Sequence, residues 1–375
     1  MPEHDDHPEP RPAALPRLEI PVETGRGERY PVHVGAGLFA GEAAAILDRL
    51  GPSRRVVLSS PPIWKLHGQS LSRALGGEVL LVPDGERAKT LRTVSRVYDA
   101  LVELAADRAT LLVVVGGGVL GDLGGFAAAS YLRGIDLVHV PTTLLAQVDS
   151  AVGGKVGVNH RLGKNLIGAF HAPRAVLADP TILGTLPRRE LRSGLYEVIK
   201  YGAIASPELL PRLAASLDGV LAKDPATLTP IIAECVGIKA AIVGADERES
   251  GVRRTLNFGH TVGHALEAAT AYARFRHGEA VAYGMLAAAA ISGERGLLAP
   301  EAIARLTDVI RRLGPMPAVA DLAATDVLDA IRHDKKLVRD RLHFVLLSGL
   351  GRTVIVDDVG PAELGRALGG IGIKA

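Results

Sequence analysis

Cysteine and aromatic residues are scarce in this 375-residue chain, which has one cysteine, one tryptophan and 4% aromatic residues. The lone Cys235 excludes an internal disulfide framework and fits a reducing compartment. An excess of one charge is also lacking, because the formal net charge is +2, so composition gives no reason to expect nucleic acid or a membrane surface as partner. We see no apolar run of transmembrane length and no signal peptide, and we expect a cytoplasmic protein.

The chain is long enough for two domains, and its 47% hydrophobic residues can supply a large core. Residues 1–16 are polar and proline-rich, and we expect a disordered tail there. From 17 to 185, short apolar runs alternate with helical patterns, which predicts βα units and a mostly parallel, Rossmann-like sheet. The expected strands are 17–21, 30–34, 55–59, 78–82, 111–115, 136–140 and 175–178, with helices at 39–50, 65–75 and 90–106.

The sequence pattern changes after residue 185, where alanine- and leucine-rich helical patterns dominate. Only 342–347 and 352–356 look extended there, as a small hairpin. We therefore expect an α/β domain at 17–185, followed by an α-helical domain at 186–375, with the active site in the crevice between them. The expected helices are 187–203, 207–222, 228–244, 257–271, 278–296, 300–313 and 325–334.

A glycine-rich junction follows the expected strand 111–115, in LLVVVGGGVLGDLGGFAAASY. Gly116, Gly118 and Gly121 satisfy G-x-G-x-x-G, a pattern that lets backbone N–H groups at a helix start approach a phosphate. Taken alone the pattern is weak, because a tight strand-to-helix turn looks the same. In parallel sheets, however, ligands bind beyond the carboxyl ends of strands. The glycine loop and residues 83–89 and 141–143 all fall there and are expected to line one crevice.

Residues 149–171 combine glycines with Lys155, Lys164 and Asn165. Lysines supply point charges and the asparagine amide both donates and accepts, so these side chains suit an anionic, hydroxylated ligand. The alternative is a solvated loop whose lysines bind nothing specific. We favour the ligand interpretation because glycines crowd these lysines.

Three histidines are candidates for a metal site. His260 and His264 are four residues apart on one helix face, the geometry of a two-histidine zinc site, and His277 opens a later helix. No glutamate follows His260, so a metalloprotease is excluded. Glu197 lies one turn before Lys200 among apolar neighbours, where a buried carboxylate requires a cation or metal. Spacing alone favours His260 and His264 as the pair, with a structural histidine as the alternative for each singly.

These motifs together resemble one family, 3-dehydroquinate synthase, a family of sugar-phosphate cyclases. The resemblance covers most of the chain from about residue 80 to residue 350, in the family's order. The similar segments are DGERAKT, GGGVLGDLGGFAAASYLRG, VPTTLLAQVDSAVGGKVGVN, GKNLIGAF, LPRRELRSGLYEVIKYG, RRTLNFGHTVGHALE, HGEAVAYGM and DKKLVRDRLHFVLL.

The resemblance implies an NAD-dependent, zinc- or cobalt-dependent phosphate lyase of the shikimate pathway. Its substrate would be 3-deoxy-D-arabino-heptulosonate 7-phosphate and its products 3-dehydroquinate and phosphate. The implied steps are transient oxidation by NAD, phosphate elimination, re-reduction and intramolecular aldol closure. In the family an arginine at the place of Arg253 reaches the neighbouring subunit's site, which implies a homodimer.

Residue by residue, the resemblance moves the metal ligands to Glu197, His260 and His277. It implies catalytic or substrate contacts at Arg133, Asp149, Lys155, Asn165, Lys200, Lys239, Arg253, Asn257, His264, Lys335 and Lys336. It implies NAD contacts at or near Asp84, Gly85, Glu86, Arg87, Ala88, Lys89, Gly117, Gly118, Val119, Leu120, Gly121, Asp122, Thr142, Thr143, Lys155, Lys164, Ile182, Leu183, Gly184 and Thr185.

Three alternatives stay open at this point. Sister cyclases that act on sedoheptulose 7-phosphate or glucose 6-phosphate share the fold, cofactor and metal triad. A metal-dependent polyol dehydrogenase would release oxidised product and reduced cofactor, and a non-catalytic NAD-binding protein would turn over nothing. Retention of GGK at 153–155 with Lys239 and His264 favours dehydroquinate synthase. Ala151 and Val156 depart from the family's usual serine and threonine, and we interpret both as packing changes.

Overall fold

The structure is a computed structural model that describes residues 17–374 apart from residues 26, 250 and 339–342, and it describes no side chains at 333–338. The expected tail at 1–16 lies outside the described residues, so its disorder stays a prediction. The side chains of Lys335 and Lys336 are likewise outside what is described.

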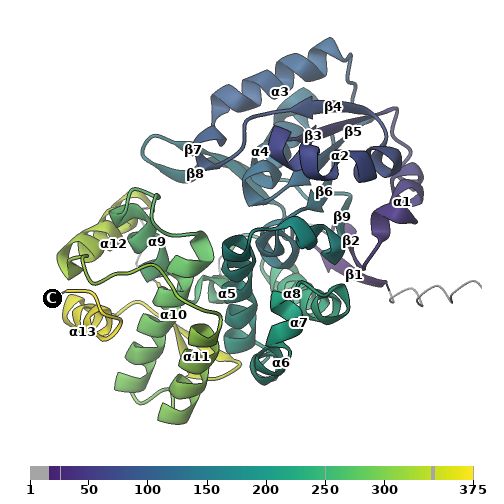
Figure 1. Cartoon of the computed structure of the whole chain (residues 1–375). Helices are drawn as coiled ribbons and strands as arrows, with labels where there is room; N and C mark the ends of the chain where they lie inside the picture. Colours follow the sequence, from purple (N-terminus) through teal and green to yellow (C-terminus); the bar gives the residue numbers. More distant parts are fainter. Residues whose placement is uncertain (1–16, 26, 250, 339–342, 375) are drawn as a thin grey trace, which may run out of the picture.

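A seven-stranded sheet in the order β1-β2-β9-β6-β5-β3-β4 forms the first half of the chain (Figure 1). Every neighbouring pair is parallel except β1 and β2. Interior strands read as continuous apolar runs because helices cover both faces, and all of β5 is buried. The strands are β1 (Leu18–Glu23), β2 (Arg29–Val34), β3 (Arg54–Ser59), β4 (Glu78–Leu81), β5 (Thr110–Gly116), β6 (Asp136–Pro141) and β9 (Ala175–Ala178).

Helices cover this sheet on its two faces, as in a doubly wound fold. One hydrophobic cluster joins α1 and α2 to alternate strand residues such as Val57 and Val113. A second cluster joins α3 and α4 to the intervening residues Val56 and Leu112. The period of two along each strand divides the core in this way. The helices are α1 (Ala43–Arg49), α2 (Pro61–Leu75), α3 (Leu91–Glu103) and α4 (Gly118–Ser130).

The second half is helical apart from one antiparallel hairpin of β10 (Phe344–Gly349) and β11 (Arg352–Val356). The predicted α/β-then-helical architecture is confirmed. The expected helix 207–222 is divided into two, because Ser216 leaves helical φ and ψ. The helices are α5 (Arg188–Ile204), α6 (Leu209–Ala215), α7 (Leu217–Leu221), α8 (Pro225–Ala245), α9 (His260–Ala269), α10 (His277–Glu294), α11 (Pro300–Arg312), α12 (Ala324–Val338) and α13 (Pro361–Gly370).

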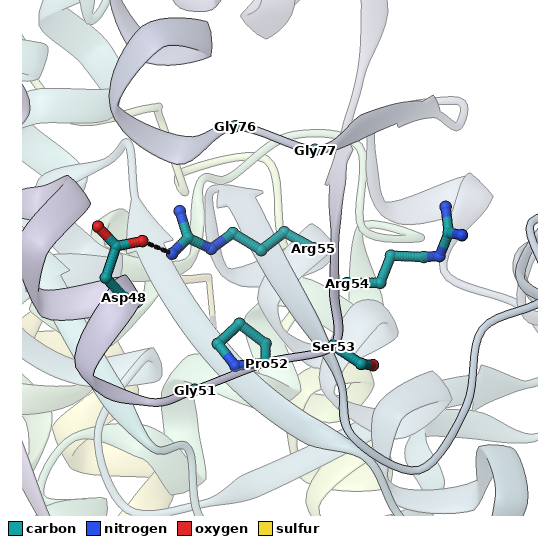
Figure 2. Close-up of a pocket in the computed structure, with 8 residues that line it drawn as sticks. All are labelled: Asp48, Gly51, Pro52, Ser53, Arg54, Arg55, Gly76 and Gly77. Carbon is teal, nitrogen blue, oxygen red and sulfur yellow. Dashed lines mark hydrogen bonds and ion pairs between the residues drawn. The ribbon is translucent and has the colours of Figure 1, made fainter.

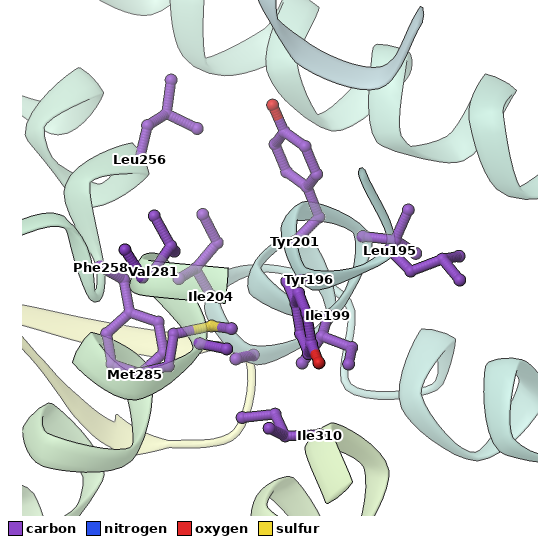
Figure 3. Packing of buried hydrophobic residues seen from close by; sticks show 14 of the residues in the cluster. Leu195, Tyr196, Ile199, Tyr201, Ile204, Leu256, Phe258, Val281, Met285 and Ile310 are labelled. Atoms are coloured by element: carbon purple, nitrogen blue, oxygen red, sulfur yellow. The ribbon is translucent and has the colours of Figure 1, made fainter. Parts of the chain in front are cut away.

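The core of the second half extends into the sheet. Figure 3 shows Ile199 and Ile204 of α5 gathered with Phe258, Val281 and Met285. The same cluster includes buried residues of β1, β2 and β9. The two halves therefore share packing along one edge of the sheet, and the boundary at 185/186 stays a prediction.

A second antiparallel hairpin, of β7 (Lys155–His160) and β8 (Gly163–Phe170), was not expected from the sequence. It leaves the sheet half on the side nearest α9 and α12 (Figure 1). Val156 of β7 is buried against α4, where a Cβ at Gly125 would lie 2.3 Å from its Cγ1. This contact accords with the interpretation of Val156 as a packing change.

Helix α8 corrects the expectation that the chain has no apolar run of transmembrane length. By length and composition alone it is apolar enough to cross a membrane, with a mean hydropathy of 1.6 over an 18-residue window. This is weak evidence, because half of that window is buried inside the protein and core helices of soluble proteins meet the same criteria. Cys235 lies fully buried in this helix, and Lys239 on it binds Asp149 of the sheet half.

Candidate active site

The chain order of the sheet reverses between β3 and β5, which are neighbours although β4 lies between them in sequence. Such a switch point opens a crevice at the carboxyl ends of the strands. The Ser59 hydroxyl donates to the Val115 carbonyl at 3.0 Å and ties the two strand ends together. Helix α4 starts here after Gly117, and none of the described side chains caps it. A Cβ at Gly118 would lie 2.9 Å from Ser150 Oγ, so only glycine leaves this helix end open to a phosphate.

Lys89 of the segment 83–89 contacts helix α4 just after the glycine loop. The Lys89 ammonium, which is buried, contacts Asp122 Oδ2 and Asn165 Oδ1, both at 2.5 Å. Asn159 Nδ2 donates to Glu86 Oε1 at 2.7 Å and strengthens the same link. The structure thus brings residues of the predicted cofactor set together with Asn165 of the predicted substrate set.

Some predicted cofactor residues have side chains that face away from the crevice. Leu120, Ile182 and Leu183 are buried in hydrophobic clusters, so only their backbone atoms are available to a ligand. Thr185 Oγ1 is hydrogen-bonded to His67 on α2 at 2.8 Å. These apolar and remote positions were carried over from the family motif, and local chemistry does not single them out.

Four donor side chains of the helical half converge. Ring nitrogens of His260, His264 and His277 lie within 4.8 Å of one another. Glu197 Oε1 is 3.8 Å from His260 Nε2 and 3.6 Å from His277 Nε2. This oxygen is fully buried and has no hydrogen-bond partner within the part of the chain that the structure describes. Ligand atoms around tetrahedral zinc, at bonds of about 2.0–2.2 Å, lie about 3.3–3.6 Å apart, so the set fits a divalent metal with little rearrangement.

A buried charge network continues from this set into the sheet half. The Lys200 ammonium lies 2.6 Å from Glu197 Oε2 and 3.2 Å from Asp149 Oδ2. Lys239 contacts Asp149 Oδ1 and donates to its carbonyl at 2.8 Å. Burial would raise the pKa of Asp149, but the two lysines outweigh burial and lower it. Burial, together with Lys200 and the other histidines, lowers the pKa of His260 well below its ordinary value, which keeps its imidazole neutral for metal.

Glu249 was not expected at this site. Its carboxylate pairs with Lys155 and accepts from Asn257, two residues of the predicted substrate set. Burial would raise the pKa of Glu249, but Lys155 and Asn257 lower it. No motif points to Glu249, although its position eight residues before Asn257 in an arginine-rich segment is a weak signal.

The two predicted arginines differ in exposure. Arg253 is only 3% exposed and donates to the Gly153 and Glu247 carbonyls of its own chain. Arg133 is exposed and has a left-handed backbone with φ of 69°. The role of Arg253 in a neighbouring subunit's site stays a prediction.

A cavity of about 290 Å³ lies elsewhere, near the amino end of β3 (Figure 2). Its charged side chains are already paired: Arg55 contacts Asp48, and Arg54 contacts Glu78 at 2.5 Å. Parallel sheets bind ligands at the opposite, carboxyl ends of their strands. We therefore assign the active site to the region between the glycine loop and the histidines, which Ser150 beside Gly118 and the contacts Asp149–Lys200 and Lys200–Glu197 join.

Comparison with known proteins identifies the family. Residues 79–193 match the 3-dehydroquinate synthase N-terminal family, and residues 194–337 match the 3-dehydroquinate synthase C-terminal family. The 3-dehydroquinate synthase of Solibacter usitatus is 47% identical over 333 residues, which cover 88% of this chain and 93% of that protein. The chain belongs to the 3-dehydroquinate synthase family.

Solved structures of related cyclases share this family's fold. The 2-epi-5-epi-valiolone synthase of Streptomyces hygroscopicus, with NAD+ and Zn2+ bound, is 31% identical with a TM-score of 0.83, over 91% of this chain and 96% of that one. A 2-deoxy-scyllo-inosose synthase complexed with carbaglucose-6-phosphate, NAD+ and Co2+ is 26% identical with a TM-score of 0.83, over 95% and 99% of the two chains. The site described above therefore lies in a fold that this chain shares with these cyclases.

Proposed function

We propose that this chain converts 3-deoxy-D-arabino-heptulosonate 7-phosphate to 3-dehydroquinate and phosphate, as a 3-dehydroquinate synthase of the shikimate pathway. One observation carries the proposal: an open helix start, a glutamate–histidine donor set and buried lysines are joined by one run of contacts through Asp149 and Ser150. Membership of the family, at 47% identity over 88% of the chain, supports the same reaction.

NAD and either Zn²⁺ or Co²⁺ are the proposed cofactors. The convergence of Glu197, His260 and His277, and the unbonded Oε1 of Glu197, support a metal at that point. The uncapped start of α4 supports an anion such as the NAD pyrophosphate there. When bound, NAD takes and returns a hydride, and the metal polarises a substrate oxygen.

The chain's own polar side chains would bind and orient the acid phosphate. Lys155 and Asn257 already hold a carboxylate, that of Glu249, which supports their selection of an anionic substrate group. His264 is exposed beside the partly buried His260 and His277, which supports contact with substrate. Lys200 and Lys239 fix Asp149, so orientation is the main contribution of this network.

We further propose a homodimer in the cytoplasm, with an NAD-binding domain at 17–185 and a metal- and substrate-binding domain at 186–375. The single cysteine supports the reducing compartment. The dimer proposal rests on the family resemblance, because Arg253 bonds within its own chain. Analytical ultracentrifugation tests it, and a monomer at micromolar concentration would contradict it.

One assay tests the reaction. Purified, metal-loaded protein is incubated with catalytic NAD and the heptulosonate phosphate, and phosphate and dehydroquinate are measured. We expect equal amounts of both products with no net NADH. A folded, metal-bound sample that makes no dehydroquinate would overturn the proposal. Turnover of sedoheptulose 7-phosphate or glucose 6-phosphate instead would indicate a sister cyclase, and NADH accumulation with a polyol would indicate a dehydrogenase.

A further inference from the structure

Glu267 on α9 joins the two walls of the crevice. The residue is only 4% exposed, and its two carboxylate oxygens have partners from opposite halves of the chain. Oε2 lies 3.3 Å from His277 Nδ1, and Oε1 accepts from Lys164 Nζ at 3.1 Å. A buried carboxylate is stable only with such partners, so its position depends on both His277 and Lys164.

The contact between Glu267 and His277 determines which ring nitrogen of His277 can bind a metal. An imidazole whose Nδ1–H is donated to a carboxylate keeps its lone pair on Nε2. Nε2 of His277 is the atom that lies 3.6 Å from Glu197 Oε1, within the donor set. Glu267 therefore selects the tautomer and the ring orientation that a metal at this site requires.

The contact with Lys164 reaches the β7–β8 hairpin, which also carries Lys155 and Asn165. Lys164 Nζ lies 4.2 Å from the centre of the Tyr272 ring, a cation–π contact. Ala271 and Tyr272 adopt left-handed backbone conformations, with φ of 51° and 56°, and Tyr272 N donates to the Glu267 carbonyl at 2.7 Å. Non-glycine residues rarely adopt this conformation, and it persists only where surrounding contacts hold it.

We propose that Glu267 is a positioning residue that couples metal binding to docking of the β7–β8 hairpin. The geometry joins the two events through one carboxylate: a metal that orders His277 also orders Glu267, which then holds Lys164. Because coupling is reciprocal, a docked hairpin raises metal affinity by the same factor by which metal favours docking. This inference rests on the metal site proposed above.

The test measures metal affinity without turnover. Glu267→Gln keeps the side-chain volume and removes the charge, and we expect Co²⁺ affinity, measured against a chromophoric chelator, to fall about 10- to 100-fold. Lys164→Met should weaken Co²⁺ binding about 2- to 5-fold. The double variant should match Glu267→Gln alone, because Lys164 acts through Glu267. The visible spectrum of bound Co²⁺ should change in the Glu267 variant.

Hydrogen exchange provides the second measurement. Zn²⁺ should slow exchange at residues 155–170 in the parent protein and have little effect there in Glu267→Gln. The control is Glu363→Gln, which breaks a carboxylate pair with Arg295 at the far end of α10 and should leave Co²⁺ affinity unchanged.

Two outcomes would overturn the inference. One is parent-like Co²⁺ affinity in Glu267→Gln, and the other is a full additional loss when Lys164→Met is added to it. Failure of the metal site itself is distinguishable, because Glu197→Gln and His260→Ala would then also bind Co²⁺ like the parent.

Discussion

The two walls of the crevice are built in different ways. On the sheet side, the open end of α4 is formed by glycines whose neighbours leave no room for a Cβ, as Ser150 does at Gly118. On the helical side, charged side chains are buried, with Glu197, Lys200 and Glu267 at most 4% exposed. The end of α4 selects by shape, and the helical side selects by charge. A substitution should therefore act through volume on the first and through electrostatics on the second.

The largest expected effect is on the helical wall. Glu197→Gln preserves volume but removes the carboxylate, so bound metal should be lost and activity should fall at least ~10³-fold, since a metal contributes several kcal/mol of charge stabilisation. Metal content after dialysis and the initial rate of phosphate release check this. Glu294→Gln, at a half-exposed carboxylate paired with Arg366, is the matched control. Stoichiometric metal in Glu197→Gln would show that the Glu197 carboxylate is not needed to hold the metal, and the electrostatic role of the helical side would be contradicted.

A buried histidine of the sheet wall provides the next test. Burial, with a smaller contribution from His171, lowers the pKa of His139 on β6 to about 4. Between pH 4 and 6.5 the unfolded chain binds a proton that the folded chain refuses, so the free energy of unfolding rises with pH through this window. The contribution is complete above pH 6.5, and about 3 kcal/mol of it is lost below pH 4.

His139→Gln should remove that dependence, because glutamine does not titrate. Urea unfolding of both proteins from pH 4 to pH 7.5, with a chelator present, measures the difference between their free energies of unfolding. That difference should change by about 3 kcal/mol across the window. Parallel pH profiles would show that His139 is charged or exposed in the folded protein, which would contradict a buried neutral imidazole on β6.

The smallest effect is expected at the glycine loop. Gly118→Ala adds a Cβ 2.9 Å from Ser150 Oγ, where it would also face the proposed phosphate. NAD affinity, measured by calorimetry, should fall about 10-fold, while Co²⁺ affinity stays that of the parent. Gly118→Ala combined with Ser150→Ala relieves the contact inside the protein. Full recovery of NAD affinity in that double variant would show that packing, and not ligand approach, requires the glycine.

Sequence patterns predicted the sheet because buried parallel strands are continuous apolar runs between turn residues. The expected strands 55–59, 111–115 and 136–140 lie inside β3, β5 and β6. The hairpin of β7 and β8 could not be predicted in this way. Exposure along β8 alternates only over residues 166–170, and the pair is held by packing of β7 on α4. Such tertiary support leaves no local signal.

The candidate site was predictable where residue type and spacing coincide. His260, His264 and His277 do converge, and Glu197 faces them. Glu267 was missed because a glutamate in a helix usually reads as an exposed residue. A signal exists, since it lies three residues after His264 and seven after His260, on one helix face. The pairs Lys155–Glu249 and Lys164–Glu267 each join residues about one hundred positions apart in the chain, a separation that no local pattern encodes.

The position of Cys235 gives this protein a built-in optical reporter. The chain has no other thiol, and this one is fully buried in α8, four residues from Lys239. A thiol reagent that releases a coloured group on reaction can therefore attack Cys235 only when α8 separates from its neighbours. Each protein molecule then releases one such group. The labelling rate then reads out the opening equilibrium of the shared core directly. Comparing that rate with and without ligands would measure how far events in the crevice spread through the molecule.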